Sequence, residues 1–229
     1  MVEIERSNWS IVLLGSFNPA IFHPSWFELH GVISSEIAAI AETKVVHNEI
    51  SIIVLGDIAI NVEASKFQVE TSVAPEIRLL DFVSKIFGDV LPHSKISSFG
   101  INKSVHFRTS TKDKRTEIGR RLAPTGPWGA FGNRVEESSG ALLGGMMSIR
   151  MREVLEDDDS RGHFEAMVEP SSAIDKNTGI FVATNRHFEL KDVPEHAGAR
   201  EAIEKLDKEF EIALKNSEEL INHFVEMAE

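Results

Sequence analysis

Two histidines in this sequence stand in similar local contexts that could support chemistry. Residues 102–107 (NKSVHF) and 185–188 (NRHF) each place an asparagine, a basic residue and a His-Phe pair near the end of an expected strand. Imidazole titrates near neutral pH, so it can bind anions or transfer protons. The catalytic candidates are therefore His106 and His187, and the candidates for binding an anion are Asn102, Arg108, Asn185 and Arg186. In the alternative interpretation, each histidine only hydrogen-bonds to a neighbouring strand or caps a helix.

A second set of candidates is the one concentration of basic residues in an acidic chain. These residues are Lys112, Lys114, Arg115, Arg120 and Arg121. They could contact a phosphate group or an acidic protein surface, including the acidic last helix of a second copy of this chain. The alternative is a solvated helix face, which is the usual role of a run of charges.

Metal and cofactor chemistry finds little support in the sequence. The chain has no cysteine, which excludes disulfides, thiolate nucleophiles and Cys-ligated metals. Residues 156–159 (EDDD) and His163 offer carboxylates and an imidazole, but they lack the alternating spacing of an acidic calcium loop. The sequence therefore predicts no metal site and no cofactor.

An aromatic segment near the start offers a further candidate for a pocket or a docking surface. It contains Phe17, Phe22, Trp26 and Phe27 and is interrupted by prolines at positions 19 and 24. The alternative is that these rings close one end of the core.

Composition limits the classes of partner. The 229 residues carry a formal net charge of −12, which disfavours general binding to nucleic acid or anionic membranes. No apolar run is long enough to cross a membrane, and the first residues lack a basic segment followed by a long apolar one. We expect a soluble intracellular protein.

The elements that must position these residues are short strands and a few amphipathic helices, so the sequence predicts an α+β fold. Strands are expected at 10–15, 50–55, 58–63, 66–71, 96–107, 142–154, 163–169 and 179–190. The apolar residues of 50–55 run together, which is typical of a strand buried on both faces or of an inner strand of a sheet. Helices are expected at 25–30, at about 35–43, from Pro75 to Gly88, at about 112–122 and from Ala199 to the end. Gly100 is interpreted as a bulge, and the segment TGPWGAFG as a loop with Trp128 and Phe131 as anchors.

The order of these elements is similar in the two parts of the chain. Both read as strands followed by a long helix, so we expect antiparallel sheet(s) with long helices packed on one face. The interpretation is a single compact domain of residues 1–229, built from two similar β-β-(β)-α halves at about 1–123 and 130–229.

Several segments also resemble a family. GSFNPAIFHPSWFELHGVI, KFQVET, FGINKSVHFR, RLAPTGPW and HFELKDV are similar to segments of a widespread group of uncharacterised bacterial proteins with two strand–helix halves. The resemblance covers most of the chain. It implies an α+β fold built as one piece, and it brings no activity and no catalytic residues. Together with the composition, we expect a protein of the bacterial cytoplasm.

Two functions follow from these observations. The first is a non-catalytic binding or interaction protein, with an unidentified protein partner or self-association. The alternative is a hydrolase, or another enzyme, that acts on a phosphorylated small molecule with His and Arg in a groove between the halves.

Overall fold

The strands of both parts of the chain join one antiparallel sheet. The computed structural model describes residues 2–137, 145–156, 160–190 and 198–229. The nine strands follow the order β2-β3-β4-β5-β1-β6-β9-β8-β7. Their bounds are β1 Ile4–Gly15, β2 Glu42–Val46, β3 Ile50–Leu55, β4 Ile58–Glu63, β5 Lys66–Thr71, β6 Ile96–Arg108, β7 Ile149–Glu156, β8 Ser160–Pro170 and β9 Gly179–Leu190.

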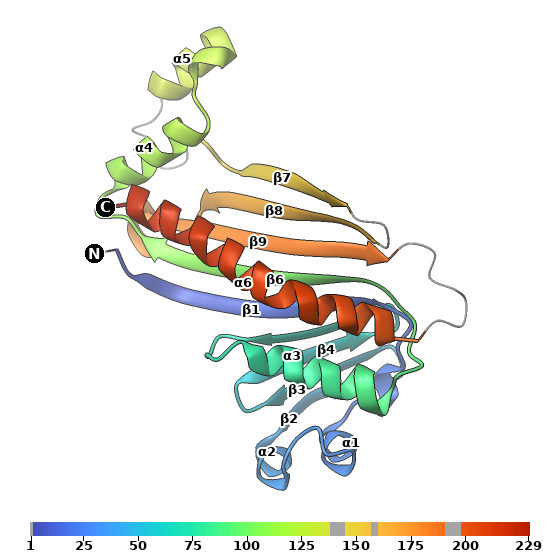
Figure 1. Cartoon of the computed structure of the whole chain (residues 1–229). Coiled ribbons are helices and arrows are strands. Elements are labelled where there is room, and N and C mark those ends of the chain that lie inside the picture. Colours follow the sequence, from blue (N-terminus) through green and yellow to red (C-terminus); the bar gives the residue numbers. More distant parts are fainter. Residues whose placement is uncertain (1, 138–144, 157–159, 191–197) are drawn as a thin grey trace.

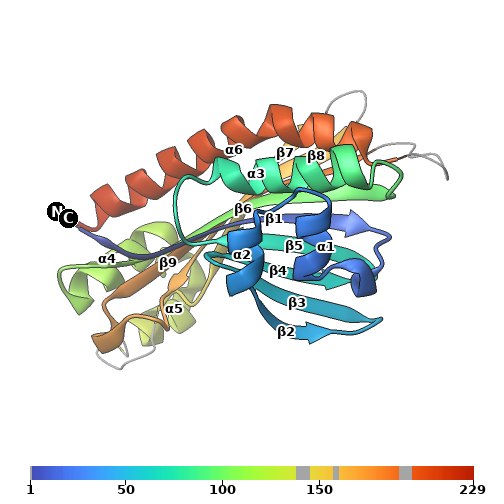
Figure 2. The ribbon, with the colours of Figure 1, turned by 90° about the horizontal axis from the view of Figure 1, so that it is seen from below.

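Two long helical segments lie across one face of this sheet (Figure 1). They are α6 (Arg200–Met227) and α3 (Ile77–Ser84), which continues as a π-helical segment, Lys85–Val90. Figure 2 shows both on the same side of the strands. The other helices are α1 (Pro24–Leu29), α2 (Ser35–Ile40), α4 (Lys112–Leu122) and α5 (Gly129–Glu137), with 3-10 turns at Pro19–Ile21, Gly126–Trp128 and Asp175–Asn177. The α+β prediction and the helix-covered face are thus confirmed.

Alternation along the strands separates an apolar face from a more polar one. In β9, the side chains of Ile180, Val182 and Phe188 are buried beneath the helices, while Asn185 and His187 point to the opposite face. We call this opposite face the open face. Strand β3 alternates in the same way and lies between β2 and β4, so Ile50–Leu55 is an inner strand of the sheet and is not buried on both faces. Because both faces of β3 carry apolar residues, its sequence hides the alternation.

The core consists of two clusters along the helix-covered face. The larger cluster lies under α3 and the first turns of α6. Phe17, Phe22 and Phe27 of the early aromatic segment are buried in it, and the partly buried Trp26 packs against it. Their rings contact Phe67, Phe82 and Phe87. The smaller cluster joins β6, β8 and β9 to Ile118 of α4 and to Ile221 and Phe224 of α6. The aromatic segment is therefore core.

Two local predictions are wrong for identifiable reasons. The pairing of β6 with β9 runs without a register shift through Gly100, so this glycine is not a bulge. The expected loop after Pro124 instead contains a 3-10 turn and α5, since Gly132 lets the helix pack closely on Thr125.

The prediction of two similar halves is not confirmed. Strands β1 and β6 of the first part lie at the centre of the sheet, and β9, β8 and β7 extend it on one side. Within the described residues, no helix is both long and apolar enough to cross a membrane.

Candidate functional site

The basic segment forms the first helix of an arm that projects from one end of the sheet (Figure 1). We call α4, the 3-10 turn Gly126–Trp128 and α5 together the helical arm. Thr111 caps α4 by accepting a hydrogen bond from the backbone N–H of Lys114, at 3.1 Å. Arg120 and Arg121 occupy its last turn, where positive charge interacts favourably with the helix dipole.

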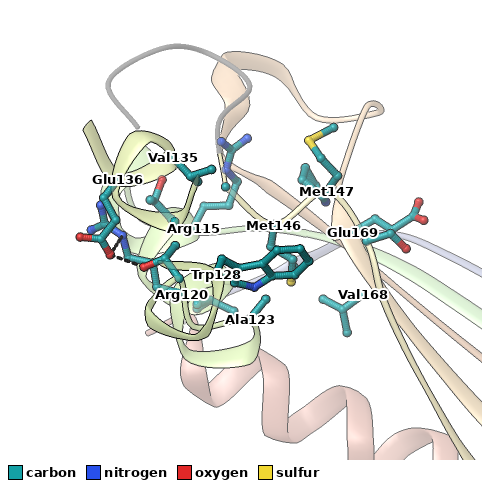
Figure 3. Close-up of a pocket in the computed structure, with 18 of the residues that line it drawn as sticks. Arg115, Arg120, Ala123, Trp128, Val135, Glu136, Met146, Met147, Val168 and Glu169 are labelled. Carbon is teal, nitrogen blue, oxygen red and sulfur yellow. Dashed lines mark hydrogen bonds and ion pairs between the residues drawn. The ribbon is translucent and has the colours of Figure 1, made fainter. Parts of the chain in front are cut away.

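A cavity of about 310 Å³ lies between the helical arm and the strand ends, and we call it the arm cavity. The sheet contributes Val168 and Ile180, and α4 contributes Ile118, all members of the smaller core cluster. The remaining apolar lining comes from Ala123, Trp128, Phe131, Val135, Met146, Met147 and Pro170. Trp128 lies across the middle of the cavity in Figure 3.

The aromatic residues of the arm are unusually accessible for their size. Trp128 is 63% exposed and Phe131 is 53% exposed, and their ring centroids are 6.0 Å apart. Large exposed aromatic rings beside a cavity are typical of ligand or partner sites, because binding removes them from water.

Charges in the arm cavity are unequally compensated. Glu136 accepts a hydrogen bond from Thr125 Oγ1 at 2.7 Å, and its Oε1 lies 3.8 Å from Arg120 Nε. Arg115, in contrast, makes no side-chain hydrogen bond or ion pair in the part of the chain that the structure describes. Burial lowers the pKa of the Arg115 guanidinium, and no neighbouring carboxylate offsets this.

The predicted anion-binding asparagines lie together, but on the open face. Asn102 of β6 is directly opposite Asn185 of β9. Asn102 Nδ2 donates to Ser10 Oγ at 3.2 Å, and the buried Oδ1 atom of Asn185 has no hydrogen-bond partner among the described residues. Gly100 leaves a small space beside them: a Cβ there would lie 3.0 Å from Asn185 Oδ1 and 3.7 Å from His187 Nδ1.

The two candidate histidines do not converge. In the register of β6 and β9, His187 is opposite Gly100, whereas His106 is opposite Phe181, six residues further along the strand. This separation corresponds to about 20 Å, too far for one reacting group. His106 Nδ1 lies 2.8 Å from Ser171 Oγ, and its pKa is lowered by burial and by the charge of Arg6.

His187 instead lies beside a second histidine, with which its sequence context does not pair it. Its ring centroid is 5.1 Å from that of His163 on β8. Burial, followed by the charge of Arg152, lowers the pKa of His163. The neutral form of the His163 imidazole is therefore favoured.

The two candidate arginines near these residues are already engaged. Arg108 Nε lies 2.6 Å from Glu5 Oε1, and its Nη1 donates to Thr178 Oγ1 at 3.0 Å. Arg186 points to the helix-covered face, away from Asn185, and its Nε and Nη2 contact Glu209 Oε2 at 2.7 and 2.5 Å. Arg186 thus does not join the asparagines in an anion site.

Glu209 is not part of an exposed acidic surface of the last helix. This carboxylate is only 8% exposed, and its second oxygen lies 3.2 Å from Lys205 Nζ. Both cations also lie over the ring of Phe188. We call the contact between Arg186, Lys205, Glu209 and Phe188 the β9–α6 seam, because it joins β9 to α6.

The remaining candidates are placed as follows. Lys114 of the basic run is 3.9 Å from Glu117, and Arg121 is exposed and outside the cavity lining. Asp157, Asp158 and Asp159 lie outside the described residues, as does part of the expected strand 142–154. Residues 2–137, 145–156, 160–190 and 198–229 hold no group of three or more His, Asp or Glu residues arranged for a metal ion.

Sequence reasoning identified the basic residues but not the cavity beside them. The sequence predicts that Arg115 contacts a phosphate group or an acidic protein surface, and it predicts Trp128 only as a loop anchor. The available signal was the combination of a basic helix with two aromatic residues in the next ten positions. Neither a scan against protein-family models nor a search of curated proteins returns a match for this chain.

Proposed function

We propose that this protein is a binding protein that holds a small, largely apolar molecule in the arm cavity. The observation that carries the proposal is the cavity itself, about 310 Å³ in volume and lined mainly by apolar side chains. This volume is at the lower end of the range for small-molecule pockets, roughly 300–1,000 Å³.

The surroundings of the cavity support a ligand site. Val168, Ile180 and Ile118 belong to a packed cluster and form a rigid wall, whereas Trp128 and Phe131 of the helical arm remain largely exposed. A ligand between them would remove both rings from water, and each buried Å² of apolar surface contributes about 25 cal/mol.

The test uses N-phenyl-1-naphthylamine, a neutral dye whose fluorescence increases in apolar sites. We expect saturable binding to the native protein. Ala123 lines the cavity (Figure 3), so Ala123→Phe fills part of it and should weaken dye binding by at least about tenfold. Ala130→Phe is the matched control, because Ala130 is exposed on the same arm and outside the lining.

Melting temperatures of both variants establish that they are folded. Equal dye binding by the native protein and Ala123→Phe would contradict the proposal, as would the absence of saturable binding to the native protein.

A further inference from the structure

The arm cavity contains one cation whose charge no described residue neutralises. Arg115 lines the cavity from α4 and is partly buried. The described residues offer its guanidinium no hydrogen bond and no ion pair. Residues 138–144, which connect the arm to β7, have the sequence SSGALLG and contain no acidic residue.

The two carboxylates of the lining do not replace a partner for Arg115. Glu136 is bonded to Thr125 and lies close to Arg120. Glu169 is on the sheet side of the cavity, and Figure 3 shows its carboxylate directed away from the cavity centre. Neither forms an ion pair with Arg115 within 4.0 Å.

Arg115 is half-buried, so its guanidinium keeps only part of its hydration and its donors are available to an anion. Withdrawing a guanidinium from water is unfavourable unless its donors are satisfied, and its planar fork matches a carboxylate or a phosphate with two parallel hydrogen bonds. The β9–α6 seam shows how the same chain satisfies a buried arginine, since Arg186 has a carboxylate there.

From this geometry we infer that the ligand of the arm cavity is an amphipathic anion, whose carboxylate or phosphate group binds Arg115 while its apolar body lies against Trp128 and Val168. This inference rests on the proposed function and specifies its ligand class. The direction of binding follows from the lining: the apolar wall is continuous with the core, and the unpaired charge is on the side of the arm.

Three eight-carbon probes separate the head groups: octanoate, octyl phosphate and 1-octanol. Each competes against N-phenyl-1-naphthylamine on the full-length protein. A hydrogen bond to a charged group contributes about 1.5–3 kcal/mol. At least one of the two anions should therefore displace the dye at a concentration about tenfold or more below that needed with 1-octanol. Whichever anion is better identifies the head group as carboxylate or phosphate.

Arg115→Met removes the charge and keeps the length of the side chain, so the preference for the anion over octanol should fall to about one. Arg121→Met makes the same change on the same helix outside the lining, and it should keep the preference. Arg115→Lys keeps the charge without the fork and should retain part of it.

The outcomes distinguish the two proposals. If the dye binds but octanol competes as well as both anions, or Arg115→Met keeps the preference, the anion inference is overturned and the cavity remains a ligand site. If Arg121→Met loses the preference as fully as Arg115→Met, the effect is general electrostatic attraction and the inference also fails. If the dye does not bind at all, the proposed function itself fails.

Discussion

The β9–α6 seam and the helical arm differ in whether their partly or fully buried arginine forms an ion pair. In the seam, Arg186 is 7% exposed and shares Glu209 with Lys205, so the charge is satisfied within the protein. In the arm, Arg115 is less buried but forms no ion pair with a carboxylate of the described residues. The first arrangement serves stability, and the second leaves binding capacity for a molecule from outside. Four substitutions test this difference.

The largest effect is expected in the seam. Glu209→Gln removes the carboxylate that Arg186 and Lys205 share and leaves Arg186 buried without its anion. Breaking a buried pair in this way costs about 3–5 kcal/mol of the free energy of unfolding. Urea denaturation measures it, with Glu211→Gln on the exposed side of α6 as the control, where a change below about 0.5 kcal/mol is expected. Equal midpoints for the two variants would show that the seam is not a stabilising contact.

Arg186→Met should cost less than the loss of Glu209. Lys205 remains 3.2 Å from Glu209 and still balances its charge, so we expect a loss of about 2 kcal/mol. The same urea series measures it. A loss as large as that of Glu209→Gln would mean that Lys205 does not compensate.

Gly132→Ala tests how the arm is held together. A Cβ at this position would lie 2.0 Å from the backbone oxygen of Thr125, so α5 must move away from the 3-10 turn. We expect a loss of about 1–2 kcal/mol together with loss of dye binding in the arm cavity. Asn133→Ala, exposed on the next position of α5, should leave both properties unchanged. Unaltered dye binding in Gly132→Ala would indicate that the cavity does not depend on the position of α5.

Arg115→Met should have the smallest effect on stability. Because no described residue pairs with this guanidinium, its removal should change the free energy of unfolding by less than about 0.5 kcal/mol. The comparison with Arg186→Met uses the identical substitution in the two regions. A destabilisation of 2 kcal/mol or more would show that Arg115 supports the fold and is not held available for a ligand.

The sequence predicted elements whose signals are local. Strand β9 and helix α4 have the expected bounds, because alternation and a capped amphipathic pattern are both complete within each segment. The sequence does not predict helix α5, because Gly129 and Gly132 both lower the helical propensity of the segment. The close contact with the backbone of Thr125, which requires a glycine at position 132, is visible only in the structure.

The candidate sites failed where they required a tertiary arrangement. His106 and His187 occupy similar sequences, yet strand register separates them by six residues. Arg186 and His187 are adjacent in sequence and lie on opposite faces of the sheet, so a motif of consecutive residues could not be one site. The lack of an ion pair at Arg115 depends on where α5 and β8 place their carboxylates, Glu136 and Glu169, and no local sequence pattern predicts this.

The central position of β1 has a consequence for how the chain folds. Its pairing with β5 can form early, but its other side pairs with β6, and Ser10 and Asn102 are 92 residues apart. At translation rates of about 5–20 residues per second, the edge of β1 that pairs with β6 stays unpaired for roughly 5–20 s. Such long-range pairing slows folding and leaves an unsatisfied strand edge in the nascent chain. We therefore expect assembly of the sheet to depend on protection from aggregation until β6 has been synthesised.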